Sequence, residues 1–423
     1  MELSAFFLRS ARQQQQEGNL DRAETLYRAA LGQDEKNIEA LNALANLLFT
    51  QHRFEEASQR LEQLVQLTPD DAEAWCTWGS SLQFLGHIDD AIQKYEHATR
   101  MAPDFAQAWY FSGCAHLKQG DFKTGWKLHE WRLKSPNVAT DAYRNYPVPL
   151  WDGSPLAPEE TLVVFTEQGM GDTLQFARYL PLLKQRAQGN VIFYTYPELK
   201  TLFDTGWTGM DAIMTMDQPI PPHQVHFPLM SAPYLLEDML DGRVSVSFPY
   251  IPVAPKCITQ WQAHIPQTEA LKIGFVWSAK LDTYKNCPLA YFYPLAKTPG
   301  TQWYSLQVGE IASDMVTSLS SHGISHLGHR IQDFSDTAGI LANLDLLIAV
   351  DTSIVHLAGA MNKPVWTLLP YAHDWRWMTR RTDTPWYPSM RLFRQEHLNQ
   401  WDDVFQDVKQ ALDQLITIPS CRG

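Results

Sequence analysis

Long hydrophobic runs are missing from this sequence of 423 residues. A helix that crosses a bilayer needs roughly 20 predominantly apolar residues in a row. The most apolar stretch, Leu341–Val350, is shorter and contains Asp345. At the N-terminus Glu2 stands where an export signal carries a basic residue, and the apolar stretch that follows is too short for such a signal. These absences predict a soluble protein located in the cytoplasm.

Positive charge is also scarce, with 34 lysine and arginine residues against 47 aspartate and glutamate residues and a formal net charge of −13. Binding to nucleic acid normally requires a basic surface. The charge balance therefore argues against nucleic acid as a partner, although it leaves room for a local basic pocket that holds one diphosphate.

Cysteine is rare, and metal-binding patterns are absent. The five cysteines are Cys76, Cys114, Cys257, Cys287 and Cys421. Their number is odd, and no two have the spacing of metal ligands. No Asp-X-Asp triplet of the kind that holds a divalent cation occurs in the chain. We therefore expect reduced structural thiols, no metal site and no bound cofactor.

Small residues recur every 34 positions in the first third of the chain. The four repeating sets are Ala23, Ala57, Ala91 and Gly125; Gly18, His52, Gly86 and Gly120 five positions earlier; Tyr27, Leu61, Tyr95 and His129 four positions later; and Glu35, Pro69, Pro103 and Asn137 twelve positions later. This register resembles the tetratricopeptide family, in which each repeat forms two helices. It predicts an all-α superhelix of about four repeats over residues 1–137.

Such an array usually offers a concave groove to a peptide or protein, and the alternative is that it only stabilises its neighbour. The fourth unit departs from the pattern, since Gly125 and His129 replace the usual alanine and tyrosine. Trp126 and Trp131 lie in the same unit. We interpret this unit as one adapted to dock on the part of the chain that follows.

The sequence changes character after the repeats. Five prolines fall within residues 135–160, which predicts a linker at 138–160 because a helix cannot run through them. Strand, helix and strand patterns then alternate, as in a parallel sheet. Expected strands are 161–166, 191–196, 271–277, 302–307, 344–350 and 365–369, and expected helices are 173–187, 311–322, 353–361 and 401–416. We assign two open α/β lobes, residues 161–265 and 266–423.

A glycine-rich turn, Glu167–Asp172, follows the first expected strand and contains Gln168, Gly169 and Gly171. Glycine lets a ligand approach the backbone closely, and the N–H groups of the next helix favour an anion. Asp172, placed at the N-cap, either caps the helix or acts as a general base. Leu174 occupies the position of the third glycine of the dinucleotide fingerprint, which argues against a dehydrogenase.

A second strand-to-helix turn begins at Asp351 and continues with Thr352, Ser353 and, one helical turn later, His356. Hydroxyl and N–H groups at a helix N-terminus suit a diphosphate. Thr352 and His356 share one helix face, so His356 is placed to donate to a phosphate or ribose oxygen. The alternative is that Asp351 and Thr352 cap the helix and that His356 is a packed core residue.

Two further stretches carry positive charge. Residues 371–394 hold five arginines among aromatic residues, which suits either phosphate and sugar binding or packing. Lys280 and Lys285 lie on the loop after the strand that opens the second lobe. A lysine there is able to neutralise a leaving diphosphate, and a solvated surface position is the alternative.

The segments EQGMGDTLQFARYLPLL and DTSIVHLAGAMNKPVWTLLP together resemble bacterial proteins that join tetratricopeptide repeats to a glycosyltransferase domain. That domain is similar to the heptosyltransferase family, which has the two-lobed GT-B fold with two Rossmann-like lobes. The layout is also similar to that of O-linked N-acetylglucosamine transferases. The resemblance covers nearly the whole chain.

The resemblance implies an inverting, metal-independent hexosyl or heptosyl transfer from a nucleotide-diphosphate sugar. It matches the catalytic aspartate to Asp172 and the donor-phosphate motif to Asp351, Thr352 and His356. The family's second-lobe lysine corresponds to Lys280 or Lys285, and Gln307 lies where relatives line the donor cleft. Lys285 is followed by asparagine and cysteine where the family has an arginine–serine pair.

Two hypotheses follow. In the first, the chain is a glycosyltransferase whose first lobe binds the acceptor and whose second lobe binds the nucleotide sugar. Asp172 deprotonates an acceptor hydroxyl, possibly on a protein docked by the repeats, while Thr352, His356 and a lysine stabilise the leaving diphosphate. In the second, the transferase-like part is a scaffold without catalysis, and the repeats bind a partner.

Overall fold

A computed structural model describes residues 2–135, 146–204, 209–240, 247–279 and 283–417. The chain divides into two compact units. The first comprises Met1–Asn145 together with Asp374–Thr379, and the second comprises Tyr146–His373 together with Arg380–Gly423. The second unit holds both parallel sheets.

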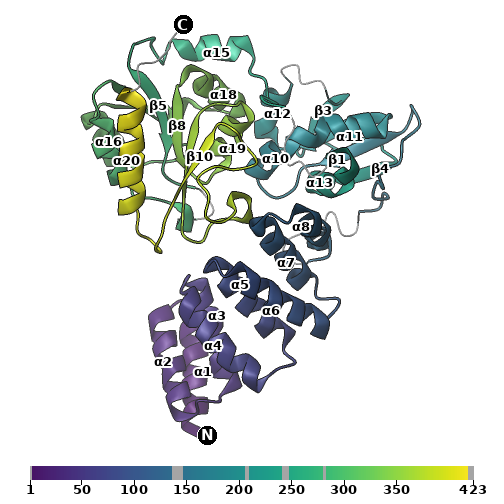
Figure 1. Cartoon of the computed structure of the whole chain (residues 1–423), viewed down its shortest axis with the longest axis vertical. Coiled ribbons are helices and arrows are strands. Elements are labelled where there is room, and N and C mark those ends of the chain that lie inside the picture. Colours follow the sequence, from purple (N-terminus) through teal and green to yellow (C-terminus); the bar gives the residue numbers. More distant parts are fainter. Residues whose placement is uncertain (1, 136–145, 205–208, 241–246, 280–282, 418–423) are drawn as a thin grey trace. The chain divides into compact units, whose positions relative to one another are not determined.

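Four pairs of antiparallel helices form the first unit (Figure 1). The helices are α1 (Glu2–Gln16), α2 (Leu20–Gln33), α3 (Ile38–Thr50), α4 (Phe54–Leu67), α5 (Ala72–Phe84), α6 (Ile88–Met101), α7 (Ala106–Gln119) and α8 (Phe122–His129). The turns inside the pairs contain the four residues predicted there, Gly18, His52, Gly86 and Gly120, with φ of 81°, 60°, 82° and 97°. The left-handed backbone explains the preference for glycine at these positions.

The recurring small residues allow the two helices of a pair to approach closely. Ala23, Ala57 and Ala91 have no exposed surface. Gly113 on α7 faces the backbone of the next helix, because a Cβ added there would lie 2.7 Å from the backbone nitrogen of His129. The predicted helical repeats are therefore present, each with a core between its own helices and those of its neighbours.

The fourth helix pair ends differently from the others. Helix α8 is short and continues as the 3₁₀ helix η1 (Glu130–Lys134). Within the first unit, the ring of Trp126 packs edge-on against Trp375, with 5.4 Å between centroids. His129 lies 6.0 Å from the same ring, whereas Trp131 stacks on Trp109 inside the array. The segment Asp374–Thr379 is thus packed on the fourth repeat mainly through Trp126.

A closed ring of four ion pairs joins the first two repeats. Arg28 pairs with Glu24 and Glu56 at 2.9 and 2.7 Å, and Arg53 pairs with the same two carboxylates at 2.6 Å each. Burial alone would raise the pKa of Glu24, but hydrogen bonds and charge from Arg53 and Arg28 hold this pKa below its ordinary value. The ring therefore favours the ionised carboxylate in the folded chain.

The second unit begins with a four-stranded parallel sheet in the order β3-β2-β1-β4. Its strands are β1 (Thr161–Phe165), β2 (Asn190–Thr195), β3 (Ala212–Thr215) and β4 (Val225–Pro228). The accompanying helices are α10 (Met170–Phe176), η2 (Ala177–Tyr179), α11 (Leu180–Ala187), α12 (Pro197–Phe203), η3 (Leu229–Ser231), α13 (Ala232–Leu235) and α14 (Glu237–Leu240).

Part of the predicted linker belongs to this first sheet. Leu150 forms a bridge with His226 on β4, and Trp151 is buried with 2% of its surface exposed. The described residues of the proline-rich stretch, 146–160, form no helix and pack as an extension of the sheet edge. Residues 138–145 of the predicted linker lie outside the described residues.

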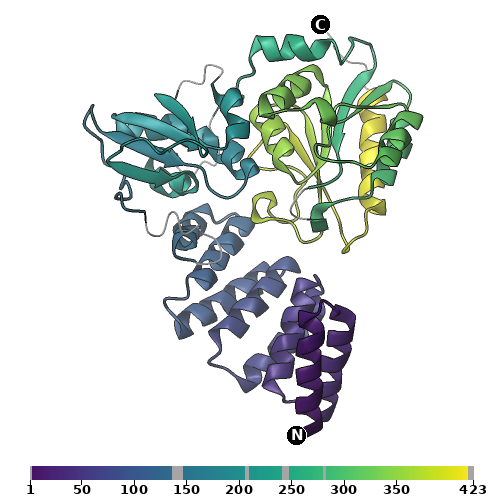
Figure 2. The same cartoon turned by 180° about the vertical axis from the view of Figure 1, so that it is seen from behind.

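A six-stranded parallel sheet follows in the order β10-β9-β8-β5-β6-β7. Its strands are β5 (Leu271–Val276), β6 (Thr301–Ser305), β7 (Ile324–His326), β8 (Leu346–Val350), β9 (Val365–Leu369) and β10 (Met390–Arg394). Its helices are α15 (Pro255–Gln262), η4 (Thr283–Lys285), η5 (Leu289–Tyr291), α16 (Phe292–Ala296), α17 (Ser313–Ser321), η6 (Gly328–Arg330), α18 (Phe334–Asn343), α19 (Ser353–Ala360) and α20 (Asp402–Thr417), whereas η7 (Trp375–Trp377) belongs to the first unit. Figure 2 shows this sheet from behind.

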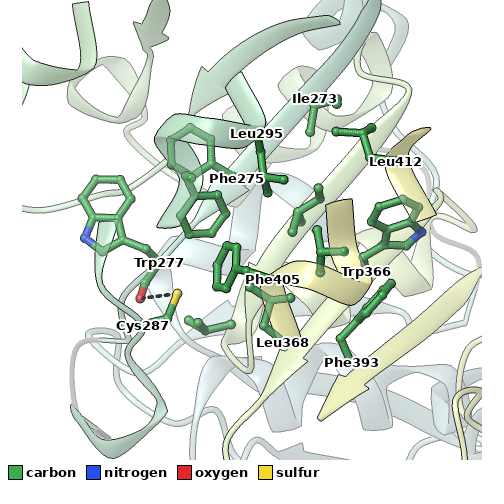
Figure 3. Packing of buried hydrophobic residues seen from close by; sticks show 14 of the residues in the cluster. Ile273, Phe275, Trp277, Cys287, Leu295, Trp366, Leu368, Phe393, Phe405 and Leu412 are labelled. Carbon is green, nitrogen blue, oxygen red and sulfur yellow. Dashed lines mark hydrogen bonds between the residues drawn. The ribbon is translucent and has the colours of Figure 1, made fainter. Parts of the chain in front are cut away.

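An aromatic core covers one face of the second sheet (Figure 3). Phe275 on β5 stacks on Phe292 of α16, with 4.6 Å between centroids. Phe405 of α20 meets the same ring edge-on at 5.1 Å. Helix α19 packs against β8 and β9, and the first-lobe helix α10 packs against α19. The region after the repeats is thus an α/β structure with parallel sheets. None of the described helices is both long enough and apolar enough to cross a membrane.

Gly113→Ala should destabilise the array, because the added Cβ would overlap the backbone of α8 and the cost of such overpacking is about 1–3 kcal/mol. Gly32→Ala on α2 is the matched control. No atom lies within 4 Å of its added Cβ, so the better helix propensity of alanine should stabilise the chain by up to about 1 kcal/mol. Urea unfolding of both variants tests this, and equal stabilities would contradict the packing described.

Lowering the pH at low salt should reduce the stability of the first two repeats. A carboxyl whose pKa is lowered by folding contributes stability that is complete above its unfolded value of about 4.3 and is lost as the pH falls through the folded value. The protection of backbone amides in α2 and α4, measured relative to their intrinsic exchange rate at each pH, should therefore fall across this range in the native chain. The change should be smaller in Glu24→Gln and unaltered in Glu62→Gln, which removes an exposed carboxyl on α4 that has no ion pair among the described residues. Identical profiles for the two variants would show that the ring is not responsible.

Candidate functional site

The two motifs singled out in the sequence lie at equivalent points of the two sheets. In each sheet the chain first adds strands on one side of its first strand and then crosses to the other side of it. This switch point lies between β1 and β4 in the first sheet and between β5 and β8 in the second. Ligands of open parallel sheets bind outside the carboxyl ends of the strands at such switch points. The turns after β1 and β8 therefore lie where an open parallel sheet usually binds its ligand.

The first turn is shaped by its own backbone. Gln168 has a positive φ of 55°, Gly169 is the N-cap of α10, and its N–H donates to Oδ2 of Asp172 at 2.8 Å. Asp172 is therefore at the third position of the helix, so the expectation that it sits at the N-cap is wrong. The sequence could not settle this because Gly169, Met170 and Gly171 are all compatible with a helix start. The other carboxylate oxygen is not part of this bond.

Hydrogen bonds of Tyr196 and Glu167 stabilise the same turn. Tyr196 donates its hydroxyl proton to the carbonyl of Gln168. Burial, and then the charges of Asp172 and Glu198, raise the pKa of Tyr196, so the phenol stays a neutral donor. Glu167 is buried, and its Oε2 accepts the backbone N–H of Met230 at 3.0 Å, which links the ends of β1 and β4.

The second turn carries an ion pair and two hydroxyls. Asp351, with 5% of its side chain exposed, lies 3.1 Å from Nζ of Lys285. Thr352 is the N-cap of α19, but its side chain forms no capping bond. Neither residue thus caps the helix through its side chain. Within the described part of the chain, the hydroxyls of Thr352 and Ser353 have no hydrogen-bond partner.

The loop after β5 is held by side chains from the second lobe. Gln307 accepts the N–H of Ser278 and donates to its carbonyl, both at 3.1 Å, and Asn286 accepts the N–H of Ala279 at 2.7 Å. Gln307 therefore supports the loop that presents Lys285. Lys280 lies outside the described residues.

The two turns meet at Gly171 and His356. A Cβ on Gly171 would lie 3.0 Å from Cδ2 and 3.5 Å from Nε2 of His356, and 3.4 Å from Cα of Ser353. Figure 1 shows α10 and α19 side by side. The structure thus brings the catalytic aspartate proposed from the sequence into the neighbourhood of the proposed phosphate motif, with the imidazole edge facing the glycine turn.

Three residues behind His356 were not singled out from the sequence. Its Nδ1 lies 2.8 Å from the hydroxyl of Tyr387. Arg178, with 1% of its surface exposed, donates to the hydroxyl of Tyr250 at 3.2 Å and to the carbonyl of Trp386 at 3.0 Å. They are far apart in the sequence, so no local pattern could have grouped them. The arginine in FARYLPLL was the one available signal, since a charged residue in an apolar helix is unusual.

The basic, aromatic stretch of residues 371–394 is used mainly for packing. Trp377 and Trp386 are buried, Arg376 pairs with Asp374 at 2.9 Å, and Arg381 pairs with Asp383 at 2.7 Å. Burial and the neighbouring Arg381 charge lower the pKa of Arg394 to about 10. Of the two interpretations of this stretch, the contacts favour packing.

The assembled groups suit an anionic ligand that also carries hydroxyls. The start of α19 supplies N–H groups and two hydroxyls, and Lys285 supplies a positive charge. Asp172 supplies a carboxylate on the opposite turn. Within residues 2–135, 146–204, 209–240, 247–279 and 283–417, no group of three His, Cys, Asp or Glu side chains is arranged to hold a metal ion.

Family models described as tetratricopeptide repeat match residues 15–76 and 76–124. Protein FlbA of Caulobacter vibrioides is 26% identical over 327 residues, which amount to 70% of this chain and 53% of FlbA. The chain therefore spans about half the length of this curated relative.

Two similar solved structures each cover 31% of this chain. The crystal structure of MamA protein is 22% identical and covers 31% of this chain and 71% of its own, with a TM-score of 0.30. MamA 41-end from Desulfovibrio magneticus RS-1 is 18% identical and covers 31% and 77%, with a TM-score of 0.30. The family models decide the assignment: the N-terminal region of this chain consists of tetratricopeptide repeats.

Proposed function

We propose that the chain is a glycosyltransferase of the two-lobed GT-B type, which moves a sugar from a nucleotide-diphosphate donor to an acceptor hydroxyl. The supporting observation is the approach of the two turns, in which Gly171 of the first lobe faces His356 and Ser353 of the second. Sugar transfer needs a base on one side of the reacting carbon and an anion-stabilising group on the other. The two turns offer these groups from opposite lobes.

Asp172 is the proposed general base on the acceptor side. Its Oδ2 is held by the N–H of Gly169 at 2.8 Å, which fixes the carboxylate that takes the proton of the acceptor hydroxyl. The deprotonated oxygen then attacks the anomeric carbon from the face opposite the leaving diphosphate, so the configuration inverts. No step in this scheme requires a metal ion.

Lys285 and the start of α19 form the proposed donor side. The ammonium group of Lys285 is fixed by buried Asp351 at 3.1 Å, and the hydroxyls of Thr352 and Ser353 flank the N–H groups of the helix. Charge that develops on the leaving diphosphate is stabilised by such preorganised donors. This placement favours Lys285 over Lys280 as the lysine of the site.

The repeats supply the proposed partner surface. Tetratricopeptide arrays bind peptides and proteins through stacked helix pairs, so a protein acceptor or a protein that delivers the acceptor fits this architecture. FlbA is 26% identical to this chain over 327 residues. The scaffold alternative retains the same surface and differs only in lacking turnover.

Asp172→Asn should reduce the release of nucleoside diphosphate from the donor by about 10²- to 10⁴-fold, the usual contribution of a general base. The amide oxygen keeps the bond to Gly169, so the turn should persist. Calorimetric titration against a panel of nucleotide sugars first identifies the donor. Asp204→Asn, which changes an exposed carboxylate on the same lobe, is the control. Absence of turnover in the unmodified chain would support the scaffold, and equal rates for the two variants would contradict Asp172 as the base. Failure of every nucleotide to bind would contradict the proposed function.

Lys285→Met should weaken binding of the free nucleoside diphosphate at least tenfold, or about 1.4 kcal/mol, because the diphosphate loses its cation. The substitution also leaves Asp351 buried without a partner, which destabilises the fold, so the double variant Lys285→Met/Asp351→Asn is measured beside it. Lys200→Met removes a lysine from a surface ion pair and should bind normally. An unchanged affinity for the nucleoside diphosphate in both Lys285→Met and the double variant would contradict the assignment of Lys285 to the donor side.

A further inference from the structure

A single peptide group of the first turn, the one between Gln168 and Gly169, takes part in two hydrogen bonds. Its carbonyl oxygen accepts the hydroxyl proton of Tyr196, and its N–H donates to Oδ2 of Asp172 at 2.8 Å. The C=O and N–H groups of a trans peptide lie in one plane and point in opposite directions. The two bonds therefore hold opposite edges of the same plane, one from the tyrosine and one from the carboxylate.

The chain on either side of this peptide group is fixed by other bonds. The N–H of Thr166 donates to the carbonyl of Tyr194 at 3.0 Å, which keeps the end of β1 in register with β2. The carbonyl of Gly169 accepts the N–H of Thr173 at 3.1 Å in the first turn of α10. Neither bond uses an atom of the peptide between residues 168 and 169, so this plane can rotate while both ends of the turn stay in place.

The backbone of Gln168 does not favour the observed plane by itself. Its φ is 55°, in the left-handed region that residues with a Cβ adopt rarely. Gly169, which follows, accepts positive and negative φ about equally and can adapt to a rotated peptide. Local conformational preference thus works against the observed orientation, and the hydrogen bonds at the two edges of the plane oppose that preference.

Tyr196 is fixed in position beside this turn. Strands β1 and β2 pair in parallel up to Tyr194, so Tyr196, two residues further on, lies next to the turn after β1. Pro197 restricts the residue before it to an extended backbone, and Tyr196 has φ of −66° and ψ of 140°. Burial, and then the charges of Asp172 and Glu198, raise the pKa of Tyr196, so its hydroxyl remains a donor at neutral pH.

We propose that Tyr196 is a positioning residue for Asp172: through the peptide of Gln168 and Gly169 it orients the N–H that fixes the carboxylate, and so keeps the general base in place for the acceptor hydroxyl. A carbonyl that accepts a hydrogen bond polarises its peptide group, which strengthens the bond donated by the N–H on the other side. This role rests on the proposed function, since it concerns the base of that reaction. Tyr196 touches no reacting atom in this scheme.

The peptide group can be observed in the ligand-free full chain. Labelling glutamine with ¹³C at the carbonyl and glycine with ¹⁵N selects the Gln–Gly peptide groups, which occur at 119–120, 168–169 and 188–189. The signal of 168–169 is identified by its loss in Gly169→Ala. It reports at once on the carbonyl bonded by Tyr196 and on the N–H bonded to Asp172.

Tyr196→Phe should move both the carbonyl carbon of Gln168 and the amide proton of Gly169 upfield, because the bonds at both edges of the peptide weaken. Tyr194→Phe is the matched control. It removes another tyrosine hydroxyl of β2 that donates to a carbonyl, that of Gln218 at 2.5 Å, and it should leave the signal of 168–169 in place. An unchanged amide proton of Gly169 in Tyr196→Phe would overturn the proposal, because the tyrosine would then have no effect on the carboxylate side of the peptide.

Turnover separates the positioning of Asp172 from a merely structural role. Tyr196→Phe should lower kcat about three- to tenfold, the usual effect of one hydrogen bond, with the KM for the nucleotide sugar unchanged. In the Asp172→Asn background the same substitution should cause no further loss, since no base remains to be positioned. A further loss of the same size in that background would show that Tyr196 acts elsewhere and would contradict the proposal.

The two measurements also separate this proposal from the proposed function. A chain that binds no nucleotide sugar, but whose Gly169 amide proton moves in Tyr196→Phe, would contradict the proposed function and leave Tyr196 as the residue that fixes the carboxylate of Asp172. Turnover that depends on Asp172 but not on Tyr196 would contradict the positioning role alone.

Discussion

The close approach of the Gly171 turn to α19 is the constraint on which the candidate site depends. A Cβ at position 171 would lie 3.0 Å from Cδ2 of His356, so the imidazole would have to shift by a few tenths of an ångström to accommodate it. Glycine thus allows two strand-to-helix turns to lie against each other. Each of these turns is at the switch point of its own sheet. The carboxylate of Asp172 and the hydroxyls of Thr352 and Ser353 then come from different lobes.

Buried polar side chains next to the two turns hold this arrangement in place. Glu167 joins the ends of β1 and β4, Gln307 holds the loop after β5, and Arg178 is fixed among aromatic rings behind His356. Buried polar groups are costly unless every bond is satisfied. Their presence at the edges of both sheets fits a site whose side chains are held in fixed positions.

The sequence predicted the elements with strong local signals. The repeat period located all four helix pairs, and the apolar runs located β1, β5, β8 and β9. The short strands β3 (Ala212–Thr215), β4 (Val225–Pro228), β7 (Ile324–His326) and β10 (Met390–Arg394) were missed, since three to five residues are too few to give a clear alternation. Two features depend on tertiary packing, which no local pattern encodes. They are the packing of Asp374–Thr379 on the fourth repeat and the grouping of Arg178 with Tyr250. The residues of both turns were found because a motif and a strand end coincide there.

Hydrogen exchange measured by mass spectrometry, with and without a panel of nucleotide-diphosphate sugars, tests the central claim that the acceptor-side turn and the donor-side turn line one shared site. The account predicts that a sugar nucleotide which binds will slow exchange in peptides covering residues 166–176 and 346–360 together. Slower exchange in only one of these segments, or in the repeats alone, would contradict it.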